Sequence, residues 1–315
     1  MQTGTRGRAQ FAAETDDDGR FVRQESAFRD RVTADGSSGF RAEPGRYHLY
    51  VSWACPWAHR AIIVRRLKAL EDVITMSAVD PIRDDRGWRF GEGRRFSPDP
   101  VNGFDLLAEA YHATDPDFEG RVTVPVLWDR ETGRIVSNES AEVIEMVNSA
   151  WDAWGDDAVD LYPDDLRDEI DAINDRVYRD VNDGVYRAGF ATTQRAYEEA
   201  FDDVFARLEE LDRLLVERRY LAGDRITLAD WRLFTTLIRF DTVYANHFRC
   251  NLRRIVDHAA LWPYLRELYQ WPGIAETVDF DHIKRHYYVT HDSINPTGIV
   301  PKGPELDLTK PHDRG

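Results

Sequence analysis

The chain has only two cysteines, Cys55 and Cys250, among its 315 residues. Two thiols cannot form the disulfide framework of a small secreted protein, and in a reducing compartment we expect both to stay free. The sequence also has no run of the roughly 18 apolar residues that a membrane span requires, so no membrane partner is expected. Its first residues lack the apolar core of a secretory signal, which predicts a cytoplasmic protein.

Lysine is also scarce. Only four of the 41 basic residues are lysines, and the formal net charge is −16. An acid excess of this size repels phosphate backbones, so nucleic acid is not expected as a partner. A surface rich in Asp and Glu suits concentrated salt, where charge repulsion is screened within about 3 Å at 1 M. We therefore favour a salt-adapted, halophilic protein; an ordinarily acidic protein from a genome that favours Arg codons is the alternative.

The hydrophobic patterns divide the chain into three parts. Residues 1–42 form a polar N-terminal extension. Residues 43–150 predict the order β-α-β, an insertion at about 81–120, then β-β-α, which is the layout of a thioredoxin-like domain. After a linker rich in Asp, Gly and Pro, residues 164–315 predict an all-helical domain with a C-terminal extension. The expected strands are 47–53, 72–79, 122–128 and 134–137, and the expected helices are 58–70, 141–149, 165–183, 193–218, 227–245 and 261–270.

The strongest chemical signal is Cys55-Pro56, between an expected strand and an expected helix. Proline suits the first helical position because its missing N–H costs nothing there. The free N–H groups and the helix dipole stabilise an anion, which favours a nucleophilic thiolate. Ala58 stands where a C-x-x-C pair has its second thiol, so an outside thiol must complete the reaction. The alternative is a cysteine buried as a small apolar side chain.

Two further motifs fit a ligand with a peptide-like backbone. Val124-Pro125 at a strand edge is expected to be cis, with the backbone of Val124 free to pair with a ligand as an added strand does. Glu139-Ser140 begins a helix, where N–H groups and a hydroxyl can bind a carboxylate while Glu139 meets an ammonium. Together they suit the α-amino acid end of a γ-glutamyl group. Plain helix capping explains Ser140 equally well, and Pro125 alone indicates only an edge strand.

Possible metal ligands are scattered along the chain. None of them shows the closed spacing of a zinc site, so we expect no metal. The residues considered are Cys55, His59, His247, Cys250, His286 and His291. Asp230, three residues after Thr227, indicates a capping box at the start of a core helix.

The motif Cys-Pro-Trp-Ala at 55–58, followed by Val-Pro-Val-Leu and Asn-Glu-Ser and then an all-helical half, resembles the glutathione transferase superfamily. The second half resembles the glutathionyl-hydroquinone reductases, the Xi class, more specifically. The segments that carry this likeness are 182–191, 238–244, 247–250 and 294–301. The resemblance runs from about Asp18 to His312. Asp183 departs from it, because a second asparagine is expected there.

The resemblance implies a thiol-exchange reaction. The Cys55 thiolate would attack the glutathione sulfur of an S-glutathionyl-hydroquinone and release the hydroquinone, and a second glutathione would resolve the mixed disulfide. It implies a hydroquinone pocket of tyrosines whose phenols hydrogen-bond and protonate the departing ring. It also implies a homodimer that associates through its helical domain. The implied residues are Trp88, Arg121, Val124, Pro125, Glu139 and Ser140 for glutathione, and Tyr186, Tyr244 and Tyr287 for the hydroquinone.

Three alternatives remain at this point. A salt-adapted host could supply γ-glutamylcysteine in place of glutathione, since the γ-glutamyl contacts would serve either thiol. The same Cys55 chemistry could belong to a general thiol transferase or a dehydroascorbate reductase. The fold could also be a binding module without catalysis, although a reactive thiol at a helix start argues against this.

Overall fold

The computed structural model describes residues 14–315, and within them the chain forms two compact units. Unit 1 contains residues 24–158, and unit 2 contains residues 14–23 and 159–315. The expected N-terminal extension therefore does not stand alone. Residues 14–23 belong to unit 2 and residues 24–42 to unit 1, while residues 1–13 lie outside the described part.

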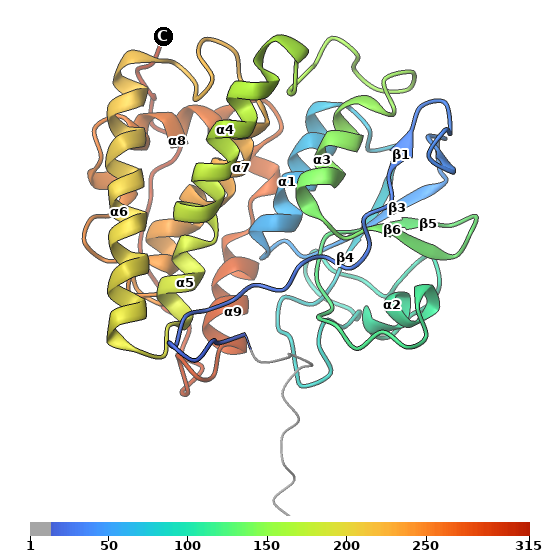
Figure 1. The fold of residues 1–315 in the computed structure, drawn as a ribbon, viewed down its shortest axis with the longest axis horizontal. Coiled ribbons are helices and arrows are strands. Elements are labelled where there is room, and N and C mark those ends of the chain that lie inside the picture. Colours follow the sequence, from blue (N-terminus) through green and yellow to red (C-terminus); the bar gives the residue numbers. More distant parts are fainter. Residues whose placement is uncertain (1–13) are drawn as a thin grey trace, which may run out of the picture. The chain divides into compact units, whose positions relative to one another are not determined.

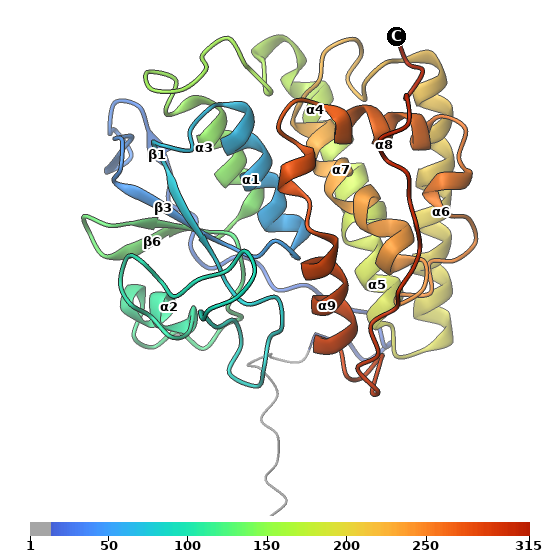
Figure 2. The ribbon, with the colours of Figure 1, turned by 180° about the vertical axis from the view of Figure 1, so that it is seen from behind.

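Unit 1 contains a four-stranded sheet in the order β4-β3-β5-β6. Strand β4 runs parallel to β3, β5 runs antiparallel to β3, and β6 runs antiparallel to β5. Helices α1 and α3 pack side by side on one face of the sheet, and α2 lies on the other face (Figures 1 and 2). This arrangement confirms the thioredoxin-like layout. The elements are β3 (Tyr47–Val51), α1 (Pro56–Leu67), β4 (Thr75–Ala78), α2 (Ala108–Thr114), β5 (Val126–Asp129), β6 (Arg134–Ser137) and α3 (Ser140–Ser149), with a small parallel pair β1 (Val32–Thr33) and β2 (Phe40–Arg41).

Strand β3 is buried along its whole length, which explains why its sequence does not alternate between apolar and polar residues. Its one basic residue, His48, is held between two hydroxyls of β4. Nδ1 lies 2.7 Å from Thr75 Oγ1 and Nε2 lies 2.8 Å from Ser77 Oγ. Burial lowers the pKa of His48 to about 4, so the imidazole is neutral inside the sheet.

Unit 2 is helical, as predicted. The long helix α6 lies beside α5 (Figure 1), and α7 contacts both α4 and α8. Two π-helical turns, η2 and η3, continue α4 and α7, and such turns occur often at functional sites. The elements are η1 (Asp164–Leu166), α4 (Arg167–Val177), η2 (Tyr178–Asn182), α5 (Gly184–Phe190), α6 (Gln194–Glu217), α7 (Leu228–Arg239), η3 (Phe240–Tyr244), η4 (Ile255–Asp257), α8 (Leu261–Gln270), η5 (Ala275–Thr277) and α9 (Phe280–Thr290).

The expected capping box at the start of α7 is present. The Asp230 carboxylate accepts a hydrogen bond from the Thr227 backbone N–H at 2.8 Å and one from the Tyr264 hydroxyl at 2.7 Å. A third bond, from the Leu221 N–H at 2.9 Å, fixes the preceding loop. The carboxylate thus joins three segments of the unit 2 core.

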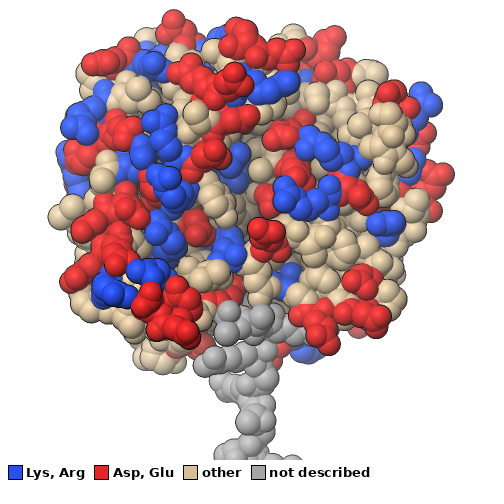
Figure 3. Space-filling view, viewed as in Figure 1, with Lys and Arg blue, Asp and Glu red and all other residues tan. Residues whose placement is uncertain are grey.

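Charged side chains of both signs are interspersed on the face drawn in Figure 3. Many arginines pair with carboxylates; Arg46, for example, binds both oxygens of the buried Asp129 at 2.8 Å. This pairing leaves the net charge of −16 unchanged, and adaptation to salt stays a prediction. Within residues 14–315, every helix is too short or too polar to cross a membrane.

Candidate active site

Cys55 lies at the start of α1, as the Cys-Pro motif predicts. Its extended backbone, with φ −78° and ψ 123°, places it at the N-cap, and Pro56 is the first helical residue. The residue is 9% exposed. Its Sγ lies 3.6 Å from the carbonyl oxygen of Val124, to which the thiol can donate. The structure therefore brings Cys55 into direct contact with the Val-Pro motif.

The Val124–Pro125 peptide bond is cis, as expected. The Val124 carbonyl accepts one long contact from the Cys55 thiol and keeps a second lone pair, and its pairing with a ligand stays a prediction. Two hydrogen bonds that the sequence does not reveal support this loop from behind. The Tyr111 hydroxyl donates to the Thr123 carbonyl at 2.9 Å, and the Asn138 side-chain amide donates to the Thr123 hydroxyl at 3.0 Å.

The start of α3 holds Glu139 and Ser140, and the helix cap differs from the one expected. Glu139, not Ser140, is the N-cap: its carboxylate accepts from the Ala141 N–H at 3.0 Å and from the Ser26 hydroxyl at 2.9 Å. Ser140 is the first helical residue, and its hydroxyl accepts from the Arg60 guanidinium at 3.3 Å. Capping therefore does not account for Ser140.

Arg60 was not singled out from the sequence, although it connects the two helix starts. It projects from the second turn of α1, is 1% exposed, and lies 4.4 Å from the ring centroid of Trp57. Through Ser140 it joins the helix that begins after Cys55 to the helix that begins after Glu139. An arginine on a helix with apolar neighbours gives no sequence signal of this contact.

The long insertion at about 81–120 contributes Arg95, which packs on Trp53, two residues before Cys55. The Arg95 guanidinium lies 3.8 Å from the Trp53 ring centroid, and the Arg95 carbonyl accepts from the Trp53 indole N–H at 2.8 Å. Trp88 is buried under the Arg83 guanidinium, which lies 5.3 Å from its ring. Arg121 is half-buried, three residues before Val124.

In unit 2 the three expected tyrosines meet through their hydroxyls. The Tyr287 oxygen lies 2.5 Å from that of Tyr186 and 2.9 Å from that of Tyr244. Burial raises the pKa of Tyr244 and of Tyr287 well above the ordinary value, and the neighbouring phenols add to the effect. Both are therefore neutral acids at physiological pH. We name Tyr186, Tyr244 and Tyr287 the tyrosine trio.

Phe248 packs against all three tyrosine rings at 5.3–5.7 Å between centroids. Gly189 is required for this packing, because a Cβ there would lie 2.3 Å from the Phe248 ring. His247 and His291 close the cluster, with Nε2 and Nδ1 3.2 Å apart. Three sequence segments that carried the family resemblance, 182–191, 238–244 and 247–250, thus converge on one aromatic cluster.

The remaining cysteine has a structural role. Cys250 is 0% exposed, and burial raises the pKa of its thiol to about 12. Neither cysteine forms a disulfide. A buried thiol with so high a pKa is a poor nucleophile, so Cys250 is not a candidate for the reactive cysteine.

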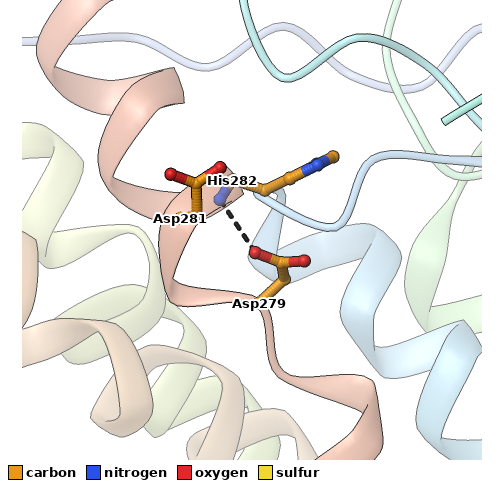
Figure 4. A group of neighbouring side chains, drawn as sticks. All are labelled: Asp279, Asp281 and His282. Carbon is orange, nitrogen blue, oxygen red and sulfur yellow. Dashed lines mark hydrogen bonds between the residues drawn. The ribbon is translucent and has the colours of Figure 1, made fainter. Parts of the chain in front are cut away.

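Within residues 14–315, one group of side chains has the spacing to hold a metal ion: Asp279, Asp281 and His282, whose ligand atoms lie within 4.8 Å of one another (Figure 4). Asp279 caps α9 by accepting from the His282 backbone N–H at 3.0 Å. Asp281 pairs with Arg285 at 3.8 Å. Helix capping and an exposed ion pair engage the two carboxylates of this group, and the lack of a metal stays a prediction.

Comparison with known proteins places the chain among glutathione transferases. Residues 54–150 match the glutathione S-transferase N-terminal domain family, and residues 194–269 match the C-terminal domain family. Glutathionyl-hydroquinone reductase YqjG of Escherichia coli K12 is 52% identical over 303 residues, which cover 94% of this chain and 92% of that protein. Glutathionyl-hydroquinone reductase PcpF of Sphingobium chlorophenolicum is 52% identical over 290 residues, covering 92% and 91%.

Solved structures agree with the sequence relatives. The glutathione-bound structure of YqjG superposes with a TM-score of 0.90, covering 91% of this chain and 96% of that one at 52% identity. The Xi-class glutathione transferase of Natrialba magadii has a TM-score of 0.90 at 51% identity, covering 91% and 88%.

Proposed function

The chain belongs to the glutathionyl-hydroquinone reductases, the Xi class of the glutathione transferases, and from this premise we propose that it reduces S-glutathionyl-hydroquinones with Cys55 as the nucleophile. The observation that carries the proposal is the position of Cys55. It stands at a helix start against the carbonyl of Val124, and no second thiol lies at position 58.

The reaction balances with two thiols, that of Cys55 and that of one free glutathione. The Cys55 thiolate attacks the glutathione sulfur, the bond from that sulfur to the ring carbon breaks, and the ring carbon takes the electron pair and a proton. A second glutathione thiolate then attacks the mixed disulfide on Cys55, which releases glutathione disulfide and regenerates the thiolate. The conjugate is reduced to the hydroquinone, and two glutathione units are oxidised.

The thiol-binding role of unit 1 is supported by the start of α3. Its backbone N–H groups and the Ser140 hydroxyl offer donors for a carboxylate. The Glu139 carboxylate accepts two hydrogen bonds and has further lone-pair capacity for an ammonium. Val124 offers its backbone once Cys55 is ionised. We assign Trp88, Arg121, Val124, Pro125, Glu139 and Ser140 to glutathione, as the family resemblance implies.

The proton source is assigned to unit 2. Tyr244 and Tyr287 are neutral because burial raises the pKa of each. A phenol that is protonated and shares hydrogen bonds with two others can give a proton to the departing ring and recover it from its neighbour. The trio is therefore proposed to recognise the hydroquinone hydroxyls and to protonate the ring.

The deciding experiment follows release of hydroquinone from glutathionyl-menadiol in excess glutathione. C55A should abolish release, whereas C250A, which alters the buried thiol, should retain it. Activity toward simple mixed disulfides without release of hydroquinone would make the protein a general thiol transferase or dehydroascorbate reductase. No thiol exchange of any kind would leave a binding module.

The identity of the thiol is a finer proposal. The scarcity of lysine and the net charge of −16 favour a salt-adapted host, in which γ-glutamylcysteine can replace glutathione. Steady-state rates with the two thiols would decide, and a clear preference for glutathione would refute the use of γ-glutamylcysteine.

We also propose that the protein forms a homodimer through its helical domain and is located in the cytoplasm. Light scattering at several ionic strengths tests the homodimer.

A further inference from the structure

The segment Glu14–Arg23, which we call the N-terminal strap, belongs to unit 2 although the chain after it enters unit 1. The Thr192 N–H donates to the Gly19 carbonyl at 3.0 Å, and the Thr193 hydroxyl donates to the Asp18 carbonyl at 2.8 Å. Gly19 has φ +80°, and a Cβ there would lie 2.6 Å from the Thr193 methyl carbon. The strap is therefore fitted closely to the loop between α5 and α6.

The end of the strap enters the aromatic cluster. Phe21 is 6% exposed and packs on Phe190 at 5.4 Å between ring centroids. Phe190 in turn packs on Phe248, which contacts the tyrosine trio. The burial of Phe21 anchors the backbone two residues before Arg23.

Arg23 makes two contacts with the first turn of α5. Its Nε donates to the Asp183 carboxylate at 2.6 Å, and its guanidinium carbon lies 4.8 Å from the ring centroid of Tyr186. Asp183 is the N-cap of α5, and Tyr186 is the third residue of that helix. Arg23 thus holds both the helix start and the ring. The aspartate at position 183, a departure from the expected asparagine, supplies the charge that pairs with this cation.

The contact is also electrostatic. Burial alone would lower the pKa of Arg23, but Asp183 and Tyr186 outweigh burial and raise the pKa above its ordinary value. Interactions of this kind are reciprocal, so the cation favours negative charge on the Tyr186 phenol. The Tyr186 hydroxyl lies 2.5 Å from that of Tyr287, so the contact with Arg23 reaches the hydrogen bonds that join the trio.

We propose that Arg23 is a positioning residue for Tyr186: the N-terminal strap holds its guanidinium on the phenol ring and so fixes the orientation and the proton sharing of the tyrosine trio. This inference rests on the proposed function for its effect on turnover, but its effect on Tyr186 can be measured without substrate. Residues before the first strand of unit 1 thereby take part in the chemistry assigned to unit 2.

The test compares R23M, R23K and D183N with the matched control R20M. Arg20 lies on the same strap but forms exposed ion pairs, including one with Glu199 at 3.0 Å. Three quantities are measured: hydroquinone release against pH, exchange with the mixed disulfide of glutathione and 2-mercaptoethanol, and spectroscopic titration of the phenols with Y186F as reference.

We expect R23M to lower kcat for hydroquinone release about ten-fold or more, because misorientation of an acid by a fraction of an ångström is costly. Exchange with the mixed disulfide, which needs no phenol, should change less than about two-fold. The Tyr186 component should titrate at higher pH in R23M and at lower pH in D183N, where the cation is unneutralised. R23K should recover part of the shift in the Tyr186 titration, because the positive charge is kept. It should recover little of the kcat, because an ammonium has no planar face to stack on the phenol ring.

The proposal is overturned if R23M slows both reactions equally, or if R23M and D183N leave the Tyr186 titration where it is in R20M. Should R23M fail to fold, R23K and D183N still give the opposed titration shifts. Absence of hydroquinone release by the unaltered protein would refute the proposed function alone, since the titration result would still decide the role of Arg23.

Discussion

The Arg60 guanidinium donates to the Ser140 hydroxyl at 3.3 Å and so ties the second turn of α1 to the first turn of α3. Both residues are buried, with 1% and 5% of their surface exposed. The N–H groups at the start of α3 are consequently held in a fixed position relative to the thiol at the start of α1. Glutathione spanning these two helix starts would bind to a preformed surface.

The first prediction concerns this contact. S140A removes the hydroxyl proposed to bind the γ-glutamyl carboxylate, and we expect glutathione affinity to fall by about 1–2 kcal/mol, on the order of five- to thirty-fold. Calorimetric titration in a C55A background measures it without turnover. S149A, at the exposed end of the same helix, where Ser149 bonds only to the Glu145 carbonyl, is the control. Equal affinities for S140A and S149A would remove Ser140 from the site.

The tyrosine trio gives the second prediction. Y287F removes the hydroxyl that joins Tyr186 to Tyr244, so the hydrogen bonds through which the phenols share protons are lost. We expect kcat for hydroquinone release to fall by about 10²–10⁴, the range of a general acid, with mixed-disulfide exchange preserved. Y197F, which loses only a bond to the Arg249 carbonyl, serves as control. A Y287F enzyme with unaltered kcat would show that the proton comes from elsewhere.

The order of strands and helices around Cys55 could be predicted because each signal is local. Strand β3 is a continuous apolar run, Pro56 marks the helix start, and the periodicity of α1 follows directly. Helix α9 was missed. Its buried residues include His282 and His286, which a hydrophobic pattern counts as polar. Helix α5 was missed because it has seven residues and two glycines, one of them Gly189 under Phe248.

The parts of the site that could not be predicted are contacts between segments far apart in sequence. Arg60 with Ser140, and Arg23 with Asp183, join residues separated by 80 and 160 positions. Each arginine resembles many other arginines in the chain, and only the folded arrangement selects these two. The tyrosines were identified through family resemblance, since no periodicity or spacing distinguishes them from packed aromatics.

The third prediction is a loss of stability in mild acid. Burial lowers the pKa of His48 and of His247 to about 4, while the unfolded chain binds these protons near the ordinary value of 6.5. Between these values the unfolded state holds more protons, so stability falls as the pH decreases from about 6.5 to 4, by up to about 3 kcal/mol per histidine. H48Q should flatten this slope in urea unfolding measured against pH. H112Q, at an exposed histidine of α2, should not; an unaltered slope in H48Q would contradict the assignment.

The fourth prediction concerns the last residues of the chain, which lie against α8 (Figure 2). The Glu267 carboxylate is 4% exposed and accepts from Arg314 at 2.7 Å, from the Tyr220 hydroxyl at 2.8 Å and from Arg219 at 2.9 Å. Burial alone would raise the pKa of Glu267, but these donors outweigh burial and lower it.

R314M leaves this buried carboxylate with one cation fewer. We expect a loss of about 1–3 kcal/mol in the free energy of unfolding at neutral pH, the cost of an undercompensated buried charge. The double variant R314M/E267Q should recover part of this loss, because the charge needing compensation is gone. R285M, whose arginine forms only an exposed pair with Asp281 at 3.8 Å, should change stability by less than about 0.5 kcal/mol. If R314M were as stable as R285M, the contact between Arg314 and Glu267 would contribute nothing to the fold of unit 2.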